Sequence, residues 1–125
     1  MTDVTRDELA RRLDEPGLVL LDVRTSGEYD GSAGYPCDAR QGHIPGARHL
    51  DLHDLLSVGD GAATLGLLGL PEGAEVIVYC HSGGRSALAA EVLAASGFEA
   101  RNYVGSWHEW SADASLPVAT SQPAA

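Results

Sequence analysis

The segment EVIVYCHSGGRSALAAEVLAAS, residues 75–96, gives the clearest indication of the fold. Residues 75–79 are rich in β-branched side chains and predict a strand, whereas residues 86–96 are rich in Ala and Leu and predict a helix that Gly97 ends. Between them, residues 80–85 form a short polar loop with two glycines and a cysteine. A strand, a loop and a helix therefore follow one another without a gap, which is typical of α/β proteins.

The sequence on the N-terminal side repeats this alternation of helix and strand. A helix is expected to begin after Thr5 and to end at Pro16-Gly17, with the Thr5 hydroxyl and the Glu8 side chain forming a capping box. The apolar run 18–23 predicts a strand that is buried on both faces. Residues 25–41 predict a long loop that contains at most a short helical turn.

The elements predicted in the rest of the chain are shorter. They are a strand at 48–50, a helix at 52–56, a Gly-rich connector, a turn at 71–73 and a last strand at 98–104. Strands that alternate with helices are parallel and are joined by right-handed crossovers. We therefore expect an α/β fold with an open, mostly parallel sheet and helices on both faces, in which ligands bind outside the carboxyl ends of the strands.

Length and composition limit the classes of protein to consider. The 125 residues, of mass 13.0 kDa and 44% hydrophobic, suffice for one domain with a buried core but not for two. The apolar run 18–21 is far shorter than the roughly 20 residues that cross a bilayer. Eighteen acidic residues against eight arginines give a net charge of −10, which argues against nucleic acid and anionic membranes as partners.

Charge and cysteine content indicate a cytoplasmic protein. Residues 1–13 carry charges where a signal peptide requires an apolar stretch. Two cysteines, Cys37 and Cys80, are too few for the disulfide framework of a small secreted domain. The cysteines and the five histidines show neither Cys-x-x-Cys nor His-x-x-x-His spacing, so the sequence predicts no metal site.

The loop that follows Cys80 has the features of an anion-binding site. Gly83 and Gly84 allow the backbone to curl so that successive N–H groups converge on one point. The following helix adds the free N–H groups of its first turn and the positive end of its dipole. Because a free cysteine titrates at about 8.5 and such surroundings lower that value, we expect Cys80 to be a nucleophile at neutral pH.

Four motifs, in this order along the chain, resemble those of a rhodanese domain. They are Leu20-Leu21-Asp22-Val23-Arg24 with Glu28-Tyr29, Gly42-His43-Ile44-Pro45-Gly46-Ala47, the loop from Cys80 to Ser86, and Gly105-Ser106-Trp107-His108-Glu109-Trp110. The resemblance covers nearly the whole chain, so we expect one rhodanese-like domain over residues 1–116 and a flexible tail over residues 117–125. The end of the chain is similar to the catalytic C-terminal half of two-domain thiosulfate and mercaptopyruvate sulfurtransferases.

The resemblance implies sulfur transfer by double displacement. Cys80 would attack the outer sulfur of a donor such as thiosulfate, expel sulfite and hold a persulfide, from which a thiol or cyanide would take the sulfur. This chemistry requires no metal and no organic cofactor. The substrate would contact the residues that follow the nucleophile, namely His81, Ser82, Gly83, Gly84, Arg85 and Ser86.

Alternatives remain for the sulfur donor and for the class of function. Glu28 would repel a carboxylate donor, so thiosulfate and a persulfide on a small thiol or a protein are the expected donors. A second hypothesis is a rhodanese module that carries sulfur for a protein partner or binds one. A third is a cysteine phosphatase, but those enzymes have five residues between the cysteine and the arginine. Only four separate Cys80 from Arg85, which leaves a smaller pocket.

Several residues near the motifs are interpreted as structural. Asp22 and Arg24 lie at a buried strand end and must find partners there, so they are expected to support the loop through hydrogen bonds. His43 is interpreted as a hydrogen-bonding residue of its turn. Trp107 and Trp110 are three positions apart, on one face of a helical turn, and are expected to pack against the sheet.

Three other residues have two interpretations each. Arg85 either donates to the anion site or pairs with an acid such as Glu28 or Asp22. His81 is either a cationic neighbour that lowers the pKa of the nucleophilic thiol or a solvent-exposed ring. Cys37 is either an exposed thiol without a role or a resolving thiol that reacts with the nucleophile.

Overall fold

The structure is a computed structural model that describes residues 3–58, 69–70 and 73–120. In these residues, four strands form one sheet: β1 (Val19–Asp22), β2 (Arg48–His49), β3 (Glu75–Tyr79) and β4 (Glu99–Asn102). Their order is β2-β1-β3-β4, and all three pairs of neighbours are parallel. The predicted open parallel sheet is therefore confirmed.

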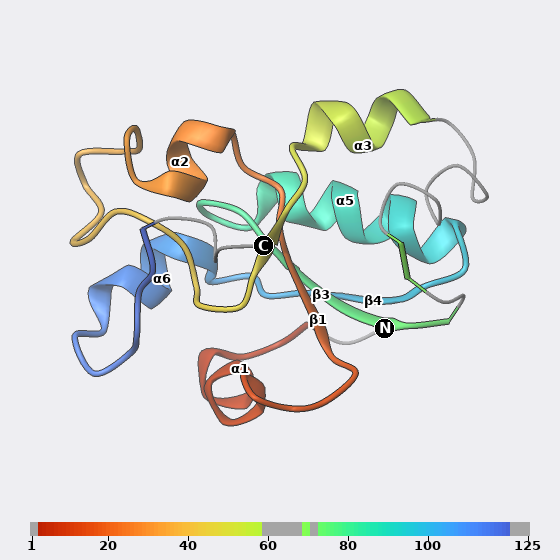
Figure 1. Ribbon diagram of the computed structural model, residues 1–125, viewed down its shortest axis with the longest axis horizontal. Helices are drawn as coiled ribbons and strands as arrows, with labels where there is room; N and C mark the ends of the chain where they lie inside the picture. The colour runs from red at the N-terminus through yellow and green to blue at the C-terminus, as the bar shows by residue number, and fades with distance from the viewer. Residues whose placement is uncertain (1–2, 59–68, 71–72, 121–125) are drawn as a thin grey trace.

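Helices cover both faces of this sheet (Figure 1). They are α1 (Arg6–Arg12), α2 (Ser26–Asp30), α3 (Leu52–Val58), α5 (Gly84–Ala95) and α6 (Ser106–Ala112). In Figure 1, α3 and α5 lie above the sheet and α1 lies below it. The predicted two-sided α/β arrangement is confirmed.

The strands divide their side chains between two apolar cores. Val76 and Val78 of β3 pack in one core with Leu93 of α5, whereas Ile77 packs in the other core with Leu9 of α1. The second core also contains both tryptophans of α6, which are fully buried against the sheet as expected. A strand that is buried on both faces reads as an uninterrupted apolar run, which is why the sequence predicts this sheet well.

The boundaries of most elements agree with the prediction within two residues. Strands expected at 18–23, 48–50 and 98–104 are observed at 19–22, 48–49 and 99–102, and helices expected at 52–56 and 86–96 at 52–58 and 84–95. The strand 75–79 is observed as predicted, and the helical turn expected within 25–41 is α2. The Gly-rich connector and residues 71–72 of the expected turn lie outside the described residues.

The capping box expected at α1 is only half formed. The Thr5 hydroxyl accepts a hydrogen bond from the Glu8 backbone N–H (3.2 Å), but the Glu8 carboxylate forms ion pairs with Arg12 and Arg101. The prediction for the Glu8 side chain was wrong because Arg101 lies far away in the sequence and next to Glu8 in space. A complete capping box is found instead at α2, between Thr25 and Glu28.

The chain remains packed beyond residue 116. His43 and Ala119 exchange backbone hydrogen bonds of 2.7 and 2.9 Å, and the Trp110 indole donates to the Pro117 carbonyl (2.8 Å). Residues 117–119 therefore contact the domain, in contrast to the flexible tail expected from Pro117. Residues 121–125 of that tail lie outside the described residues.

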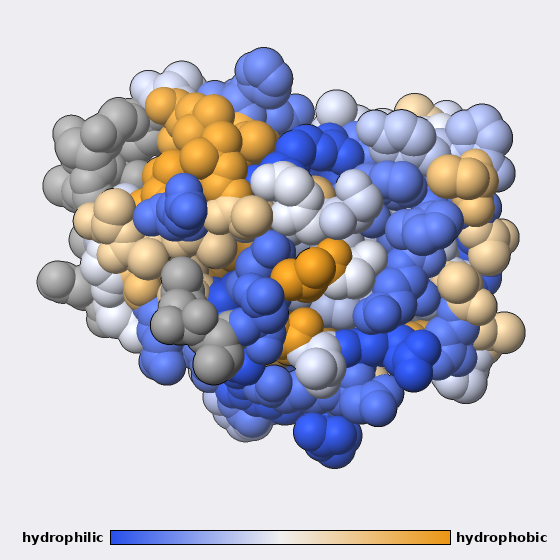
Figure 2. All heavy atoms as spheres, turned by 180° about the vertical axis from the view of Figure 1, so that it is seen from behind, coloured by the Kyte–Doolittle hydropathy of each residue, from blue (hydrophilic) through white to orange (hydrophobic). Residues whose placement is uncertain are grey.

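The face seen in Figure 2 is largely hydrophilic, in keeping with the net charge of −10. On the face seen in Figure 2, hydrophobic side chains gather mainly in one area, at the upper left of the view. Within the part of the chain that the structure describes, no helix has the length and apolar character needed to cross a membrane.

Candidate active site

Cys80 lies directly after β3, at the carboxyl edge of the sheet, and is only 1% exposed. Its Sγ accepts a hydrogen bond from the backbone N–H of Gly83 (3.1 Å) and another from the hydroxyl of Ser86 (3.3 Å). Gly83 belongs to the loop that follows β3, and Ser86 belongs to the first turn of α5. The structure thus brings Cys80, Gly83 and Ser86 together around one sulfur atom.

The surroundings of Cys80 favour its anionic form. Burial raises the pKa of the Cys80 thiol, but hydrogen bonds from the Ser86 hydroxyl and from the backbone N–H groups of Ser86, Gly83 and Ser82 lower it more. The pKa therefore lies below its ordinary value. A thiolate is the nucleophilic form of cysteine, so this arrangement can hold a reactive sulfur or another compact anion.

The two glycines of the loop have different roles. Gly83 has φ of +99°, and a Cβ there would lie 2.6 Å from the carbonyl oxygen of Val104. Gly84 is the first residue of α5, and a Cβ at that position would meet nothing within 4 Å. Only Gly83 thus needs to be glycine, and its N–H is the one that donates to the sulfur at 3.1 Å.

Ser106 is a site residue that the sequence reasoning missed. Its hydroxyl accepts a hydrogen bond from the Cys80 N–H (3.0 Å), donates to the Tyr103 carbonyl (2.8 Å) and lies 3.9 Å from the Cys80 Sγ. With φ of +55°, Ser106 is the one non-glycine residue of the described chain with a positive φ. Strained backbone of this kind is typical of functional sites. The only signal in the sequence was its place in the last motif.

Arg85 pairs with Glu28, which was one of its two interpretations. The guanidinium donates to both carboxylate oxygens of Glu28, at 2.9 and 3.1 Å. Burial raises the pKa of Glu28, but the hydrogen bonds from Arg85 and Thr25 lower it more, so Glu28 stays ionised. The negative charge of Glu28 is therefore neutralised within the protein rather than presented alone to a substrate.

Asp22 and Arg24 form a buried ion pair at the end of β1. Arg24 Nη2 lies 2.7 Å from Asp22 Oδ2 and 2.6 Å from the Gly42 carbonyl oxygen, and its guanidinium lies 5.0 Å from the centre of the Trp107 ring. Burial lowers the pKa of Arg24, but the hydrogen bond and the charge of Asp22 raise it more. The pair joins the end of β1 to the turn at residue 42, which agrees with a supporting role.

His43 contacts Tyr29. Its Nδ1 lies 2.7 Å from the Tyr29 carbonyl oxygen, and the two rings are stacked, with 3.8 Å between their centres. The pKa of the His43 imidazole lies below its ordinary value, mainly because the ring is buried. The neutral ring therefore fits a hydrogen-bonding role in its turn.

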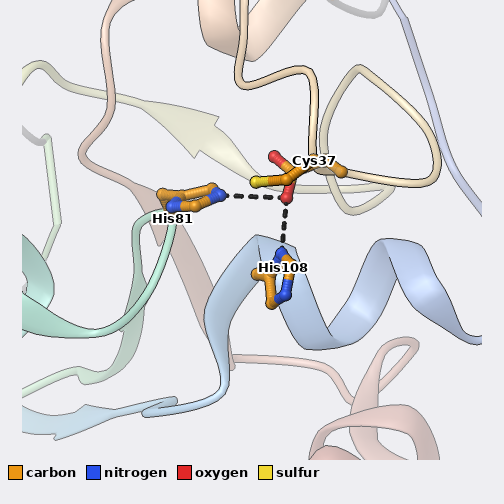
Figure 3. Close-up of side chains that lie close together, drawn as sticks. Cys37, His81 and His108 are labelled. Atoms are coloured by element: carbon orange, nitrogen blue, oxygen red, sulfur yellow. Dashed lines mark hydrogen bonds and ion pairs between the residues drawn. The ribbon is translucent and has the colours of Figure 1, made fainter.

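His81 contacts Asp38 of the long loop. Its Nε2 lies 2.9 Å from Asp38 Oδ1, and Nδ1 of His108 lies 2.8 Å from the same oxygen (Figure 3). The His81 ring also stacks on Tyr35, with 4.0 Å between the ring centres. The interpretation of His81 as a solvent-exposed ring was wrong, because Tyr35 and Asp38 from the long loop cover it. Ser82, the next residue, is exposed.

Residues 5–113 match the family described as Rhodanese-like domain. The chain belongs to this family. The resemblance predicted from the four sequence motifs is therefore confirmed. The cysteine of the third motif is Cys80. Its Sγ lies 3.1 Å from the backbone nitrogen of Gly83, at the carboxyl edge of the sheet.

Relatives of this rhodanese-like domain have names that refer to sulfur transfer. The Mycobacterium tuberculosis protein "Putative thiosulfate sulfurtransferase SseB" is 39% identical over 109 residues, which cover 82% of this chain and 38% of that protein. The Pseudomonas aeruginosa protein "Probable 3-mercaptopyruvate sulfurtransferase" is 37% identical over 123 residues, which cover 90% of this chain and 42% of that protein.

A solved structure agrees with the fold. The structure described as "Crystal Structure of Probable Thiosulfate Sulfurtransferase" superposes with a TM-score of 0.80 and 47% sequence identity. The match covers 94% of this chain and 47% of that chain. This rhodanese-like domain thus spans less than half the length of these three relatives.

Proposed function

We propose that this rhodanese-like domain is a sulfurtransferase that moves sulfane sulfur through a persulfide on Cys80. The observation that carries the proposal is the Cys80 Sγ, buried and 3.1 Å from the Gly83 N–H and 3.3 Å from the Ser86 hydroxyl. These donors favour the thiolate, and a thiolate is the form that attacks a sulfur donor. The names of the two relatives support the same class of reaction.

The proposed reaction consists of two displacements. In the first, the Cys80 thiolate attacks the outer sulfur of thiosulfate and forms a new S–S bond. The S–S bond of thiosulfate breaks, and sulfite leaves with the bonding electron pair. In the second, cyanide or a thiolate attacks the terminal sulfur of the persulfide, and Cys80 leaves as a thiolate.

The donors around Cys80 suit both displacements. Negative charge is on Sγ before the first step and on the terminal sulfur of the persulfide after it. Because the N–H groups of Ser82, Gly83 and Ser86 already point into this space, they need not rearrange when the charge moves by one atom. The sulfur is carried by the thiol of the chain itself, so the proposed reaction uses no cofactor.

For the donor we propose thiosulfate or a persulfide on a small thiol. A 3-mercaptopyruvate donor carries a carboxylate, which would need a cation of its own. The Arg85 guanidinium already binds both oxygens of Glu28, at 2.9 and 3.1 Å, so a carboxylate donor would have to displace Glu28. The P. aeruginosa relative is named for 3-mercaptopyruvate, which makes that compound the comparison donor.

The experiment that tests the proposal is thiocyanate formation from thiosulfate and cyanide by the reduced protein. We expect turnover by the wild type, none by Cys80→Ser, and wild-type turnover by the matched control Cys37→Ser. Circular dichroism of each variant checks that the fold is kept. Turnover that survives in Cys80→Ser, or hydrolysis of an aryl phosphate in place of sulfur transfer, would contradict the proposal.

A protein-borne persulfide is a third candidate donor, and the net charge favours it over thiosulfate. A charge of −10 repels a dianion such as thiosulfate and slows its capture. A sulfur adduct on Cys80 that forms from a carrier protein much faster than from thiosulfate would support this candidate.

The two cysteines are free, which fits a reducing compartment, and we propose the cytoplasm as the location.

A further inference from the structure

We propose that Cys37, Asp38, His81 and His108 form a binding site for Zn²⁺ beside the Cys80 loop. Each of the four side chains offers one ligand atom, and these atoms all lie within 4.8 Å of one another. Figure 3 shows the Cys37 thiol and the rings of His81 and His108 around the carboxylate.

The donor set suits zinc. One thiolate, two imidazole nitrogens and one carboxylate oxygen are ligands that zinc accepts in a tetrahedral site. A thiolate is too soft for Mg²⁺ or Ca²⁺, which require oxygen ligands. With the thiol deprotonated, the thiolate and the carboxylate balance the two charges of the ion. The proton of the Cys37 thiol passes to solvent when the metal binds.

The distances require only small side-chain movements. Zinc–ligand bonds of about 2.0–2.3 Å place the donors of a tetrahedral site roughly 3.4 Å apart. The nitrogens of His81 and His108 now lie 2.9 and 2.8 Å from Asp38 Oδ1. On binding, both nitrogens give up this hydrogen bond and turn a lone pair to the ion, and the thiol moves inward by the order of an ångström.

The backbone that carries the ligands is already fixed. The His108 N–H donates to the His81 carbonyl (3.0 Å), so the two histidines are held at a set distance. The Tyr35 ring stacks on His81, and the Asp38 N–H donates to the Tyr35 carbonyl (3.1 Å), which holds the long loop against the same ring. Because these segments are already ordered, the protein loses less conformational entropy when the metal binds.

The site is open to an ion from solvent. Cys37 is exposed and the His108 side chain is 54% exposed, whereas the Asp38 side chain is 1% exposed. The buried carboxylate gains a full counter-charge when the ion arrives. Spacing rules applied to the sequence predict no metal site because the ligands come from three separate segments.

The test is a titration of the reduced protein with Co²⁺ under anaerobic conditions. We expect the intense visible bands of four-coordinate cobalt and a thiolate-to-cobalt charge-transfer band, saturating at one ion per chain and abolished by Zn²⁺. Cys37→Ser should lose the charge-transfer band, and His108→Ala should bind at least about tenfold more weakly. Both positions are exposed, so these variants keep the fold.

Two further variants identify the ligands. His53→Ala, which removes an exposed histidine of α3, should leave the titration unchanged. Cys80→Ser should keep both spectral features, because Cys80 is not one of the four ligands. The proposal is overturned if the bands do not form, if they persist at full strength in Cys37→Ser and His108→Ala, or if they disappear in Cys80→Ser.

Discussion

The loops that follow β3 and β1 meet at the same edge of the sheet and are built in different ways. After β3, a few residues direct N–H and hydroxyl groups at one sulfur, and the donors lie three and six positions after Cys80. At the end of β1 and beyond it, charged side chains form ion pairs: Asp22 of β1 with Arg24, and Glu28 of α2 with Arg85 of α5. The loop after β3 holds a reactive atom, whereas the charged pairs join β1 to the turn at residue 42 and α2 to α5.

This difference separates two kinds of substitution. Changes in the loop after β1 should mainly lower the free energy of unfolding. Removal of the Ser86 hydroxyl, a side-chain donor to Cys80, should mainly alter the reactivity of the thiol. A variant that behaves in the opposite way would remove the distinction between the two loops.

The largest expected loss of stability comes from Asp22→Asn. The side chains of Asp22 and Arg24 are 0% and 1% exposed, so the substitution leaves a buried guanidinium without its carboxylate. We expect the free energy of unfolding to fall by about 3–5 kcal/mol. Urea denaturation measures this, with Asp14→Asn, at an exposed position, as the matched control. A loss below about 1 kcal/mol would show that the pair does not support the loop.

Gly83→Ala comes next, with a loss of about 2 kcal/mol. Residue 83 has a φ of +99°, which is unfavourable for alanine, and the new Cβ would lie 2.6 Å from the Val104 carbonyl oxygen. Gly84→Ala is the matched control, because a Cβ there meets nothing within 4 Å, and it should leave the unfolding midpoint equal to or slightly above that of the wild type. Equal midpoints for the two variants would contradict the different roles of the two glycines.

Arg85→Ala decides between the two interpretations of that residue. It removes both hydrogen bonds to the buried Glu28 carboxylate, and we expect a loss of about 1–2 kcal/mol in the free energy of unfolding with only a small change in the KM for thiosulfate. Arg6→Ala breaks two ion pairs at the surface, with Asp7 and Asp113, and should leave the midpoint unchanged. Unaltered stability together with a large rise in KM would instead place the guanidinium on the substrate.

Ser86→Ala should change the reactivity of Cys80 and leave stability nearly unchanged. The Ser86 hydroxyl lowers the pKa of the thiol, so its loss raises that pKa and moves the alkylation rate profile to higher pH. Below the pKa of the variant, the rate should be about tenfold lower than in the wild type. Iodoacetamide labelling from pH 5 to 9 measures this, with Ser57→Ala on α3 as the control. Superimposed profiles would show that the hydroxyl does not act on the sulfur.

The same lowered pKa has a consequence for stability. The folded protein holds the Cys80 proton less tightly than the unfolded chain, in which a thiol titrates at about 8.5. The ionised thiol therefore adds stability above that pH. This contribution is lost as the pH falls through the folded-state pKa.

Sequence proximity explains which parts of the site could be predicted. The donors to Cys80 lie within six positions of it, and the sheet follows from apolar runs, so both could be predicted from local patterns. Glu28, 57 positions from Arg85, could be named only as one of two candidate acids, and Asp38, 43 positions from His81, could not be named at all. Ser106 was missed for the same reason, since 26 positions separate it from Cys80.

The measurement that tests the central claim most directly is the intact mass of the reduced protein after incubation with thiosulfate, followed by peptide mapping. Our account predicts a gain of one sulfur atom, located on Cys80, which cyanide removes. Cys80→Ser should gain none, and Cys37→Ser should gain the same single sulfur. A sulfur found on Cys37, or a gain that survives in Cys80→Ser, would contradict the claim that Cys80 carries the transferred sulfur.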